Sequence, residues 1–148
     1  MEIDYFLDDI TPDFILAEKS NYIRFHHQKA IYLCQMKVQW NQISDILISN
    51  LSNEEKRIWL AINIRGVGFK ESSHFLRNIG YRNLAILDRH ILRNLVDCEV
   101  FDSIPNICNI SQYQAVEKKY TDFAEKVNIP MDELDLLFWS YMTGRIIK

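Results

Sequence analysis

The sequence predicts an all-α protein with two small helical lobes around a cleft. Apolar residues recur at helical spacing through most of the chain, and cap-forming residues precede several of these stretches. Turn signals of the Asn-Gly type, which mark β-hairpins, do not occur in the sequence. With 148 residues and few glycines or prolines, the chain is expected to form a single compact unit over residues 1–148.

Helices are expected, in order, over residues 22–37, 42–50, 52–64, 69–79, 89–97, 111–127 and 130–142. Ser52 or Asn53 can cap the third of these helices, Asp88 the fifth and Ser111 the sixth, because short polar side chains accept hydrogen bonds from free N–H groups. Pro130 and the acids that follow it favour the start of the last helix. Glycines that can stop a helix follow two of these segments, at Gly80 and Gly144.

The formal net charge is −3, but the charge is unevenly distributed. Residues 56–95 contain eight Lys or Arg and two acids, a net +6, which leaves −9 for the rest of the chain. Local basicity can attract phosphate, because exposed charges act over only about 10 Å, although a solvated charged face is the alternative. Residues 1–20 form an acidic N-terminal segment, with six acids and one Lys, that DNA would repel.

Several protein classes are disfavoured by the sequence. Its start lacks the basic-then-apolar order of a signal peptide, and no apolar run is long enough to span a membrane. Cys34, Cys98 and Cys108 form no C-x-x-C pair, so we expect reduced thiols in a cytoplasmic protein. No H-x-E motif with cysteine ligands occurs, and the adjacent His26 and His27 are expected to point to different sides of a helix. We therefore expect no metal site and no cofactor.

The segment "RGVGF" joins two expected helices and predicts a helix–hairpin–helix at about residues 54–79. Gly66 and Gly68 can adopt positive φ and carry no Cβ, so the backbone there can come close to another molecule. The second helix begins with free N–H groups, which can bind phosphate, and Arg65 flanks the turn. A tight turn between helices, without any ligand, is the alternative.

Lys70, in the first turn of the second helix, and Asp88, eighteen residues later, are the candidate catalytic residues. The positive end of the helix and partial burial would both disfavour the protonated amine, and a neutral amine is a nucleophile. Asp88 can cap the next helix and still act in catalysis. The alternatives are a solvated surface lysine and a plain helix cap.

The segment "IRGVGFKESSHFLRNIGYRNLAILDRHIL" resembles the catalytic core of the archaeal-type (type 2) 8-oxoguanine DNA glycosylase/AP lyases. These enzymes belong to the helix–hairpin–helix DNA glycosylase superfamily, whose pattern of G-x-G, lysine and aspartate is matched by Gly66, Gly68, Lys70 and Asp88. The resemblance continues through "AEKVNIPMDELDLLFWSYMTGRIIK" and covers some 125 residues. It implies a glycosylase-like fold and a role in base excision repair. It also implies a monomer that binds double-stranded DNA containing an oxidised base. The expected location is the nucleoid.

The resemblance implies that Lys70 attacks C1′ of the damaged nucleotide, displaces 8-oxoguanine and forms an imine that permits β-elimination. Asp88 would stabilise positive charge on the sugar and assist proton transfers. The damaged base has to leave the duplex to be reached. The hairpin would hold the DNA phosphates at Arg65, Gly66, Val67 and Gly68.

In this family an aromatic residue from an early helix and a tryptophan near the C-terminus sandwich the flipped base, which implies Phe25 and Trp139 here. The C-terminal lysine takes part in reading the base. The chain ends in Lys148, so its terminal carboxylate could accept the N7–H that 8-oxoguanine has and guanine lacks. Core packing is the alternative for both aromatic residues, and a solvated tail is the alternative for Lys148.

Members of this family carry an additional N-terminal helical segment, so this chain is expected to be short where the base pocket forms. Two other functions stay open. One is a glycosylase for another damaged base, although the branch with a four-cysteine cluster is disfavoured because only Cys98 and Cys108 follow the core. The other is a non-catalytic or degenerate helix–hairpin–helix DNA-binding module, which the short N-terminus favours and the presence of both Lys70 and Asp88 disfavours.

Overall fold

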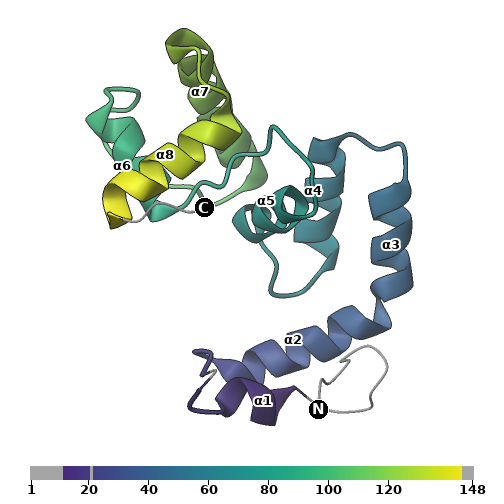
Figure 1. Cartoon of the computed structure of the whole chain (residues 1–148). Coiled ribbons are helices and arrows are strands. Elements are labelled where there is room, and N and C mark those ends of the chain that lie inside the picture. The colour runs from purple at the N-terminus through teal and green to yellow at the C-terminus, as the bar shows by residue number, and fades with distance from the viewer. Residues whose placement is uncertain (1–11, 21, 145–148) are drawn as a thin grey trace.

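The part of the chain that the structure describes, residues 12–20 and 22–144 of a computed structural model, folds into helices without strands. The helices are α1 (Asp13–Ala17), α2 (His26–Val38), α3 (Trp40–Ile48), α4 (Asn53–Asn63), α5 (Phe69–Asn78), α6 (Arg89–Asp97), α7 (Ile110–Val127) and α8 (Met131–Thr143) (Figure 1). The prediction of an all-α fold is confirmed. None of the helices within these described ranges is long and apolar enough to cross a membrane.

Local capping explains where several helices begin. Ser52 Oγ accepts the N–H of Glu55 at 3.2 Å, and the Glu55 carboxylate accepts the N–H of Ser52 at 2.8 Å, which forms a capping box for α4. The prediction that Ser111 caps the helix near it is wrong. Asn109 is the cap, because its Oδ1 accepts the N–H of Gln112 at 2.9 Å. Helix α7 begins at Ile110, so Ser111 already lies inside the helix.

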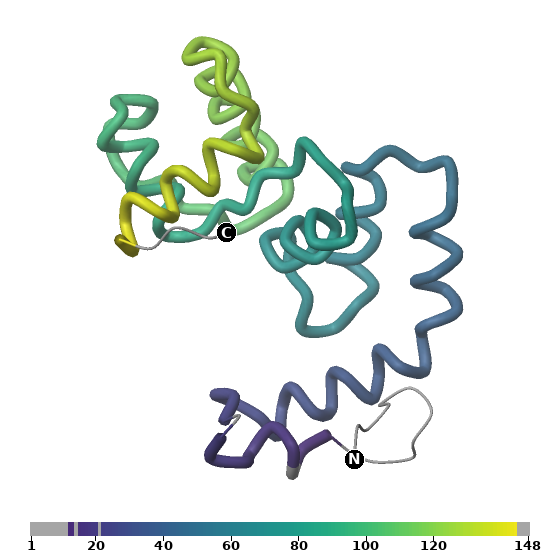
Figure 2. The backbone as a smooth tube through the Cα atoms, in the orientation of Figure 1, coloured from purple at the N-terminus to yellow at the C-terminus, as the bar shows by residue number. Residues whose placement is uncertain are grey.

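Two buried clusters divide most of the helices into two groups. Helices α3, α4 and α5 enclose the first cluster, Ile43, Leu60, Ile64, Leu76 and Leu84. Helices α6, α7 and α8 enclose the second and larger cluster, which includes Ala85, Leu87, Leu95, Tyr113, Tyr120 and Phe138. The chain passes from one group to the other between α5 and α6 (Figure 2). Because Leu84 belongs to the first cluster and Ala85 to the second, this connection joins the two lobes.

Buried ion pairs also hold the two lobes together. Arg57 of α4 is 1% exposed and pairs with both carboxylate oxygens of Glu117 in α7. Arg77 of α5 likewise pairs with Asp135 of α8. Within the first lobe, Lys56 of α4 donates to the carbonyl of Leu47 in α3 at 2.9 Å. Three of the eight basic residues in the segment 56–95 are therefore occupied inside the protein. These three residues are therefore not free to contact phosphate.

Helices α1 and α2 form an arm that extends from the rest of the protein, at the bottom of Figure 1. Helix α2 begins at His26 rather than at residue 22, because Phe25 has a left-handed backbone with φ 63°. The prediction that His26 and His27 point to different sides of the helix is wrong. Both rings reach the carboxylate of Asp13 in α1, because these first two residues of the helix lie beside α1.

Candidate active site

The hairpin between α4 and α5 has the predicted left-handed residue at one of its two glycines. Gly66 has φ +84°, and a Cβ built on it would lie 2.2 Å from Cδ2 of the Tyr32 ring. A glycine at position 66 is therefore favoured by the packing of Tyr32 against the hairpin, whether or not DNA binds there. Gly68 has φ −87° and precedes α5 without a side-chain cap, and Arg65 is exposed with its guanidinium 5.6 Å from the Tyr32 ring centre.

Lys70 lies in the first turn of α5, as predicted, but it is less buried than expected. Its side chain is 46% exposed, and Nζ forms an ion pair with Glu71 Oε1 at 2.9 Å. Burial of Glu71 opposes its ionisation, yet hydrogen bonds from Lys70 and from the backbone at Glu71 and Gly68 outweigh it and lower the pKa of Glu71. The Glu71 carboxylate thus lies at the start of α5, where the hairpin was expected to hold a phosphate.

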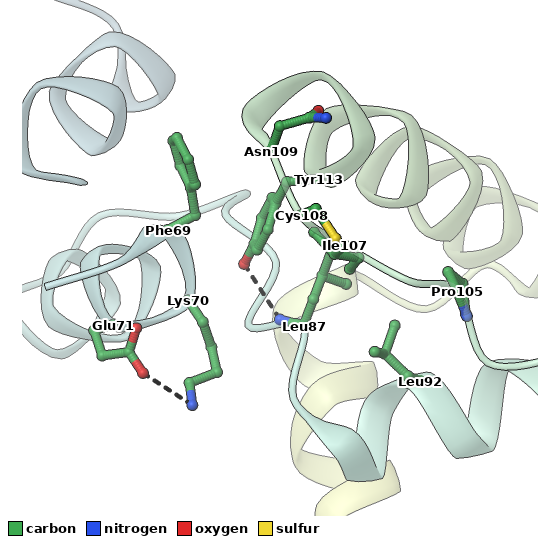
Figure 3. Close-up of a pocket in the computed structure, with 10 residues that line it drawn as sticks. All are labelled: Phe69, Lys70, Glu71, Leu87, Leu92, Pro105, Ile107, Cys108, Asn109 and Tyr113. Atoms are coloured by element: carbon green, nitrogen blue, oxygen red, sulfur yellow. Dashed lines mark hydrogen bonds and ion pairs between the residues drawn. The ribbon is translucent and has the colours of Figure 1, made fainter. Parts of the chain in front are cut away.

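Lys70 lines a cavity of about 410 Å³ between α5 and the loop that leads into α7 (Figure 3). One wall of this cavity is the connection between α5 and α6, which Tyr113 holds in place. The Tyr113 hydroxyl accepts the N–H of Leu87 at 3.3 Å and donates to the carbonyl of Ala85 at 2.8 Å. Burial raises the pKa of Tyr113, so the hydroxyl keeps its proton for the second of these bonds.

Asp88 lies at the end of the same connection and caps α6, as predicted. Its Oδ1 accepts the N–H groups of His90 and Ile91 at 2.8 and 2.9 Å, which fixes the carboxylate and leaves its second oxygen for another partner. Asp88 borders a second cavity, of about 300 Å³, which it shares with His74 and Trp139. The structure therefore brings Asp88 and Trp139 together, while Lys70 borders the neighbouring cavity.

Asp135 is a further acidic residue at the second cavity, and the sequence interpretation missed it. It is buried, it accepts from the Tyr120 hydroxyl at 2.7 Å, and it pairs with Arg77 of α5. Burial raises the pKa of Asp135 to about 6, despite the hydrogen bonds from Tyr120 and Arg77 that lower it. An acid inside the apolar stretch "LDLLFW", one helical turn before Trp139, was the available signal.

One of the expected base-pocket residues, Phe25, is not assembled with Trp139. Phe25 precedes α2 in the arm, is 65% exposed, and has its ring 4.6 Å from the guanidinium carbon of Arg24. It borders neither the Lys70 cavity nor the Asp88 cavity. Lys148 lies outside the described residues.

Comparison with known proteins decides the family. A sequence model of the family described as 8-oxoguanine DNA glycosylase matches residues 12–129, most of the chain. The chain belongs to the 8-oxoguanine DNA glycosylase family. The predicted resemblance is confirmed, and the helix–hairpin–helix glycosylase fold with it.

Members of the 8-oxoguanine DNA glycosylase family from two organisms illustrate the similarity. The chain is 44% identical to an 8-oxoguanine DNA glycosylase/AP lyase of Fusobacterium nucleatum subsp. nucleatum, over 90% of this chain and 64% of that protein. It is 40% identical to the protein of the same name from Methanocaldococcus jannaschii, over 84% of this chain and 60% of that protein. The chain thus spans less than two thirds of the length of these relatives.

Solved structures of this family agree in fold. The crystal structure of the Methanocaldococcus jannaschii 8-oxoguanine DNA glycosylase superposes with a TM-score of 0.82 at 38% identity, over 97% of this chain and 66% of that one. The same organism's glycosylase/lyase in complex with a 15mer DNA containing 8-oxoguanine gives a TM-score of 0.81 at 38% identity, over 92% of this chain and 64% of that one.

The side-chain groups at the two cavities, an amine and a carboxylate, indicate what chemistry this 8-oxoguanine DNA glycosylase family member can perform. An accessible primary amine can form an imine with a sugar aldehyde, and a carboxylate fixed nearby can stabilise a developing cation. Glu71, which the sequence interpretation also missed, pairs with the amine and is the residue next to it in the sequence. Trp139 lines the Asp88 cavity, and its indole is of the side-chain type on which bases stack.

Proposed function

We propose that this protein is a base excision repair DNA glycosylase and AP lyase that removes 8-oxoguanine from double-stranded DNA. The observation that carries the proposal is that Lys70 and Asp88 line two cavities along the connection between α5 and α6, of which Asp88 is the last residue. Family membership and the complex of a relative with DNA containing 8-oxoguanine support the substrate. We also propose that the protein acts as a cytoplasmic monomer on nucleoid DNA.

In the proposed reaction, the neutral amine of Lys70 forms a bond to C1′ of the damaged nucleotide while the bond from C1′ to the base breaks. The departing base takes up a proton, and the nitrogen lone pair then opens the sugar ring to give an imine. Loss of a proton from C2′ breaks the bond from C3′ to its phosphate oxygen, which nicks the strand. Asp88 stabilises the positive charge on the sugar and assists the proton transfers.

The remaining proposed site residues bind the base and the backbone. The flipped base enters the Asp88 cavity and stacks on Trp139, and the Lys148 carboxylate accepts its N7–H. Because Phe25 borders neither cavity, it completes the pocket only after the arm moves toward Trp139. DNA phosphates contact the exposed Arg65 and the backbone from Gly66 through Val67 to Gly68. Because the Glu71 carboxylate lies at the start of α5, a phosphate bound there has to replace it as the partner of those N–H groups.

Borohydride trapping tests the proposal directly, because reduction of the imine leaves a covalent protein–DNA complex. The substrate is a duplex with one 8-oxoguanine opposite cytosine, and the matched undamaged duplex is the first control. We expect a trapped complex with the untagged wild-type chain and none with Lys70→Gln. Asp88→Asn should lower the rate by about 10²-fold or more. Lys118→Gln, which removes an exposed lysine of α7, should behave as wild type.

Two outcomes would contradict the proposal. Equal trapping by wild type and Lys70→Gln would show that another amine forms the imine. Absence of trapping by a wild-type chain that circular dichroism shows to be helical, with retained binding to the duplex, would favour a non-catalytic DNA-binding module. Trapping on another oxidised base in place of 8-oxoguanine would keep the chemistry and change the substrate.

A further inference from the structure

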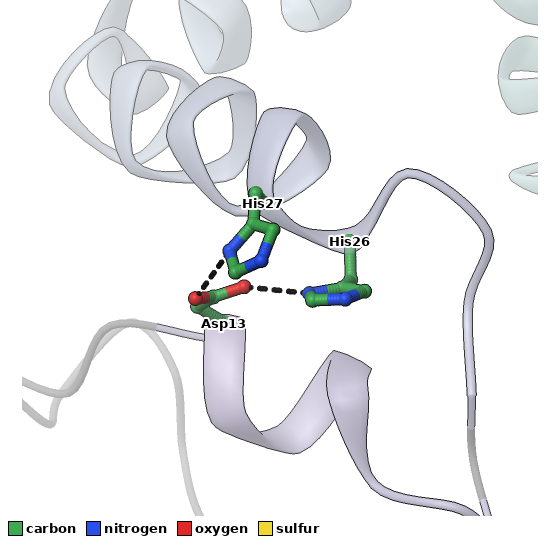
Figure 4. A group of neighbouring side chains, drawn as sticks. All are labelled: Asp13, His26 and His27. Carbon is green, nitrogen blue, oxygen red and sulfur yellow. Dashed lines mark hydrogen bonds and ion pairs between the residues drawn. The ribbon is translucent and has the colours of Figure 1, made fainter.

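The arm carries a group of three side chains that the proposed reaction does not use. Asp13 of α1 lies between the first two residues of α2 (Figure 4). Its Oδ1 is 2.9 Å from His26 Nδ1, and its Oδ2 is 2.8 Å from His27 Nδ1. The side chains of His26, Asp13 and His27 are 18%, 38% and 77% exposed, so solvent and small ions reach the group.

We propose that Asp13, His26 and His27 form a Zn²⁺ site that joins α1 to α2. One ligand atom from each of these residues lies within 4.8 Å of the other two, which is close enough for a single ion to bind all three. Two imidazole nitrogens and a carboxylate oxygen are a frequent ligand set of Zn²⁺, with water as the fourth ligand of the tetrahedron. The expectation of no metal site depended in part on the two histidines diverging, and they converge on one carboxylate.

The side chains have to rearrange to bind the ion. The present N···O distances of 2.8 and 2.9 Å are those of hydrogen bonds. Tetrahedral Zn²⁺ with bonds of about 2.0–2.1 Å separates its ligand atoms by about 3.3 Å. Each hydrogen-bonded N···O pair therefore has to open by roughly half an ångström, and ligand atoms that now lie up to 4.8 Å apart have to approach one another. His27 is the most exposed of the three and can turn freely. Each Nδ1 proton moves to Nε2 through solvent, and the nitrogen lone pair then faces the ion.

Two charges act on a cation in this group. The positive end of α2 disfavours the cation, whereas the carboxylate of Asp13 favours it. Zinc would fix the start of α2 immediately after Phe25, whose backbone is left-handed with φ 63°. The site therefore links α1 to α2 next to a residue with a left-handed backbone.

Zinc titration of the untagged full chain, in competition with a chromophoric chelator, tests the site. We expect one Zn²⁺ per chain, and a loss of affinity of at least about tenfold in each of Asp13→Asn, His26→Ala and His27→Ala. His74→Ala in α5 and a chain with Cys98→Ser and Cys108→Ser are the controls, and both should bind as wild type does. Equal affinity of the wild type and the three ligand variants, or loss of binding in the cysteine variant, would overturn the proposal.

A second measurement uses the wild-type chain alone, so it does not depend on the folding of a variant. In nitrogen-detected NMR of the imidazoles, Zn²⁺ should shift the Nδ1 signals of two histidines and leave the other two unchanged, since the sequence has four. Shifts that involve His74 or His90, or no shift at saturating zinc, would contradict the site. Zinc binding is separable from the proposed glycosylase reaction, since neither Lys70 nor Asp88 takes part in it.

Discussion

Replacing Asp135 by Asn is expected to make the protein more stable relative to wild type as the pH rises from about 4 to 7. The Asp135 carboxyl is buried between α7, α5 and α8, where it meets the Tyr120 hydroxyl and the Arg77 guanidinium. Burial raises its pKa from 3.8 to about 6, although both partners favour the charged form. The structure therefore predicts that desolvation of this carboxylate outweighs its ion pair.

The sign follows from proton binding. The folded protein holds the Asp135 proton more tightly than the unfolded chain does, so the stabilising contribution is fully present below the ordinary pKa of 3.8 and is lost as the pH rises through about 6. A shift of about two pKa units corresponds to roughly 3 kcal/mol, at about 1.4 kcal/mol per unit. Asn cannot titrate, so the Asn variant does not lose this stability as the pH rises. The free energy of unfolding of the Asn variant minus that of wild type should therefore increase with pH, by up to roughly 3 kcal/mol.

Urea unfolding at several pH values between 4 and 7.5 measures this difference for wild type and Asp135→Asn. Asp122→Asn, which removes an exposed carboxylate of α7, corrects for the loss of one charge. Carbon-detected NMR of the Asp135 carboxyl should show a titration near pH 6 in the folded protein. If the Asn variant instead loses stability relative to wild type as the pH rises, the ion pair with Arg77 dominates and the reasoning is refuted.

Three other substitutions test the hairpin and its surroundings. Gly66→Ala should lower the free energy of unfolding by about 1–3 kcal/mol, and by more than Gly80→Ala does. Both glycines have positive φ, but only at Gly66 would a Cβ meet an aromatic ring. Equal losses of the two variants in urea unfolding would contradict this prediction. Arg57→Met should cost about 3–5 kcal/mol in the same assay, because it removes the ion-pair partner of the Glu117 carboxylate, which is only 14% exposed, and a loss below about 1 kcal/mol would refute the role of the pair. Glu71→Gln removes the ion-pair partner from which the amine of Lys70 has to separate before it reaches the sugar, so borohydride trapping should be faster, by up to about fivefold for an exposed pair, and slower trapping would count against it.

Local chemistry made the helices of the core predictable. The helix expected over residues 89–97 is α6 at both ends, because Asp88 caps it through two hydrogen bonds that involve only the next few residues. The hairpin helices were predicted to within a residue or two, because a capping box starts α4 and two glycines separate it from α5. Signals of this kind depend on residues three or four positions apart, and the sequence displays them directly.

Features that depend on distant partners could not be predicted. Arg57 and its carboxylate are 60 residues apart, and Arg77 and Asp135 are 58 apart, so nothing local distinguishes these arginines from exposed ones. The net charge of the segment 56–95 consequently overstated what it can offer to DNA. Helix α1 has five residues, too few for a periodic pattern, and so the meeting of Asp13 with the two histidines was invisible as well.

The candidate site shows the same division between local and distant causes. The spacing of Lys70 and Asp88 follows from the sequence, but their placement at neighbouring cavities results from the connection between α5 and α6, which Tyr113 pins to α7. In the proposed reaction both residues act on one sugar, so that sugar has to lie across this connection, with its base directed toward Trp139. Asp88 is held by two backbone hydrogen bonds, whereas Lys70 is nearly half exposed at the end of a long side chain. The lysine is therefore the partner that moves to the sugar, and release from Glu71 is the step that this movement requires.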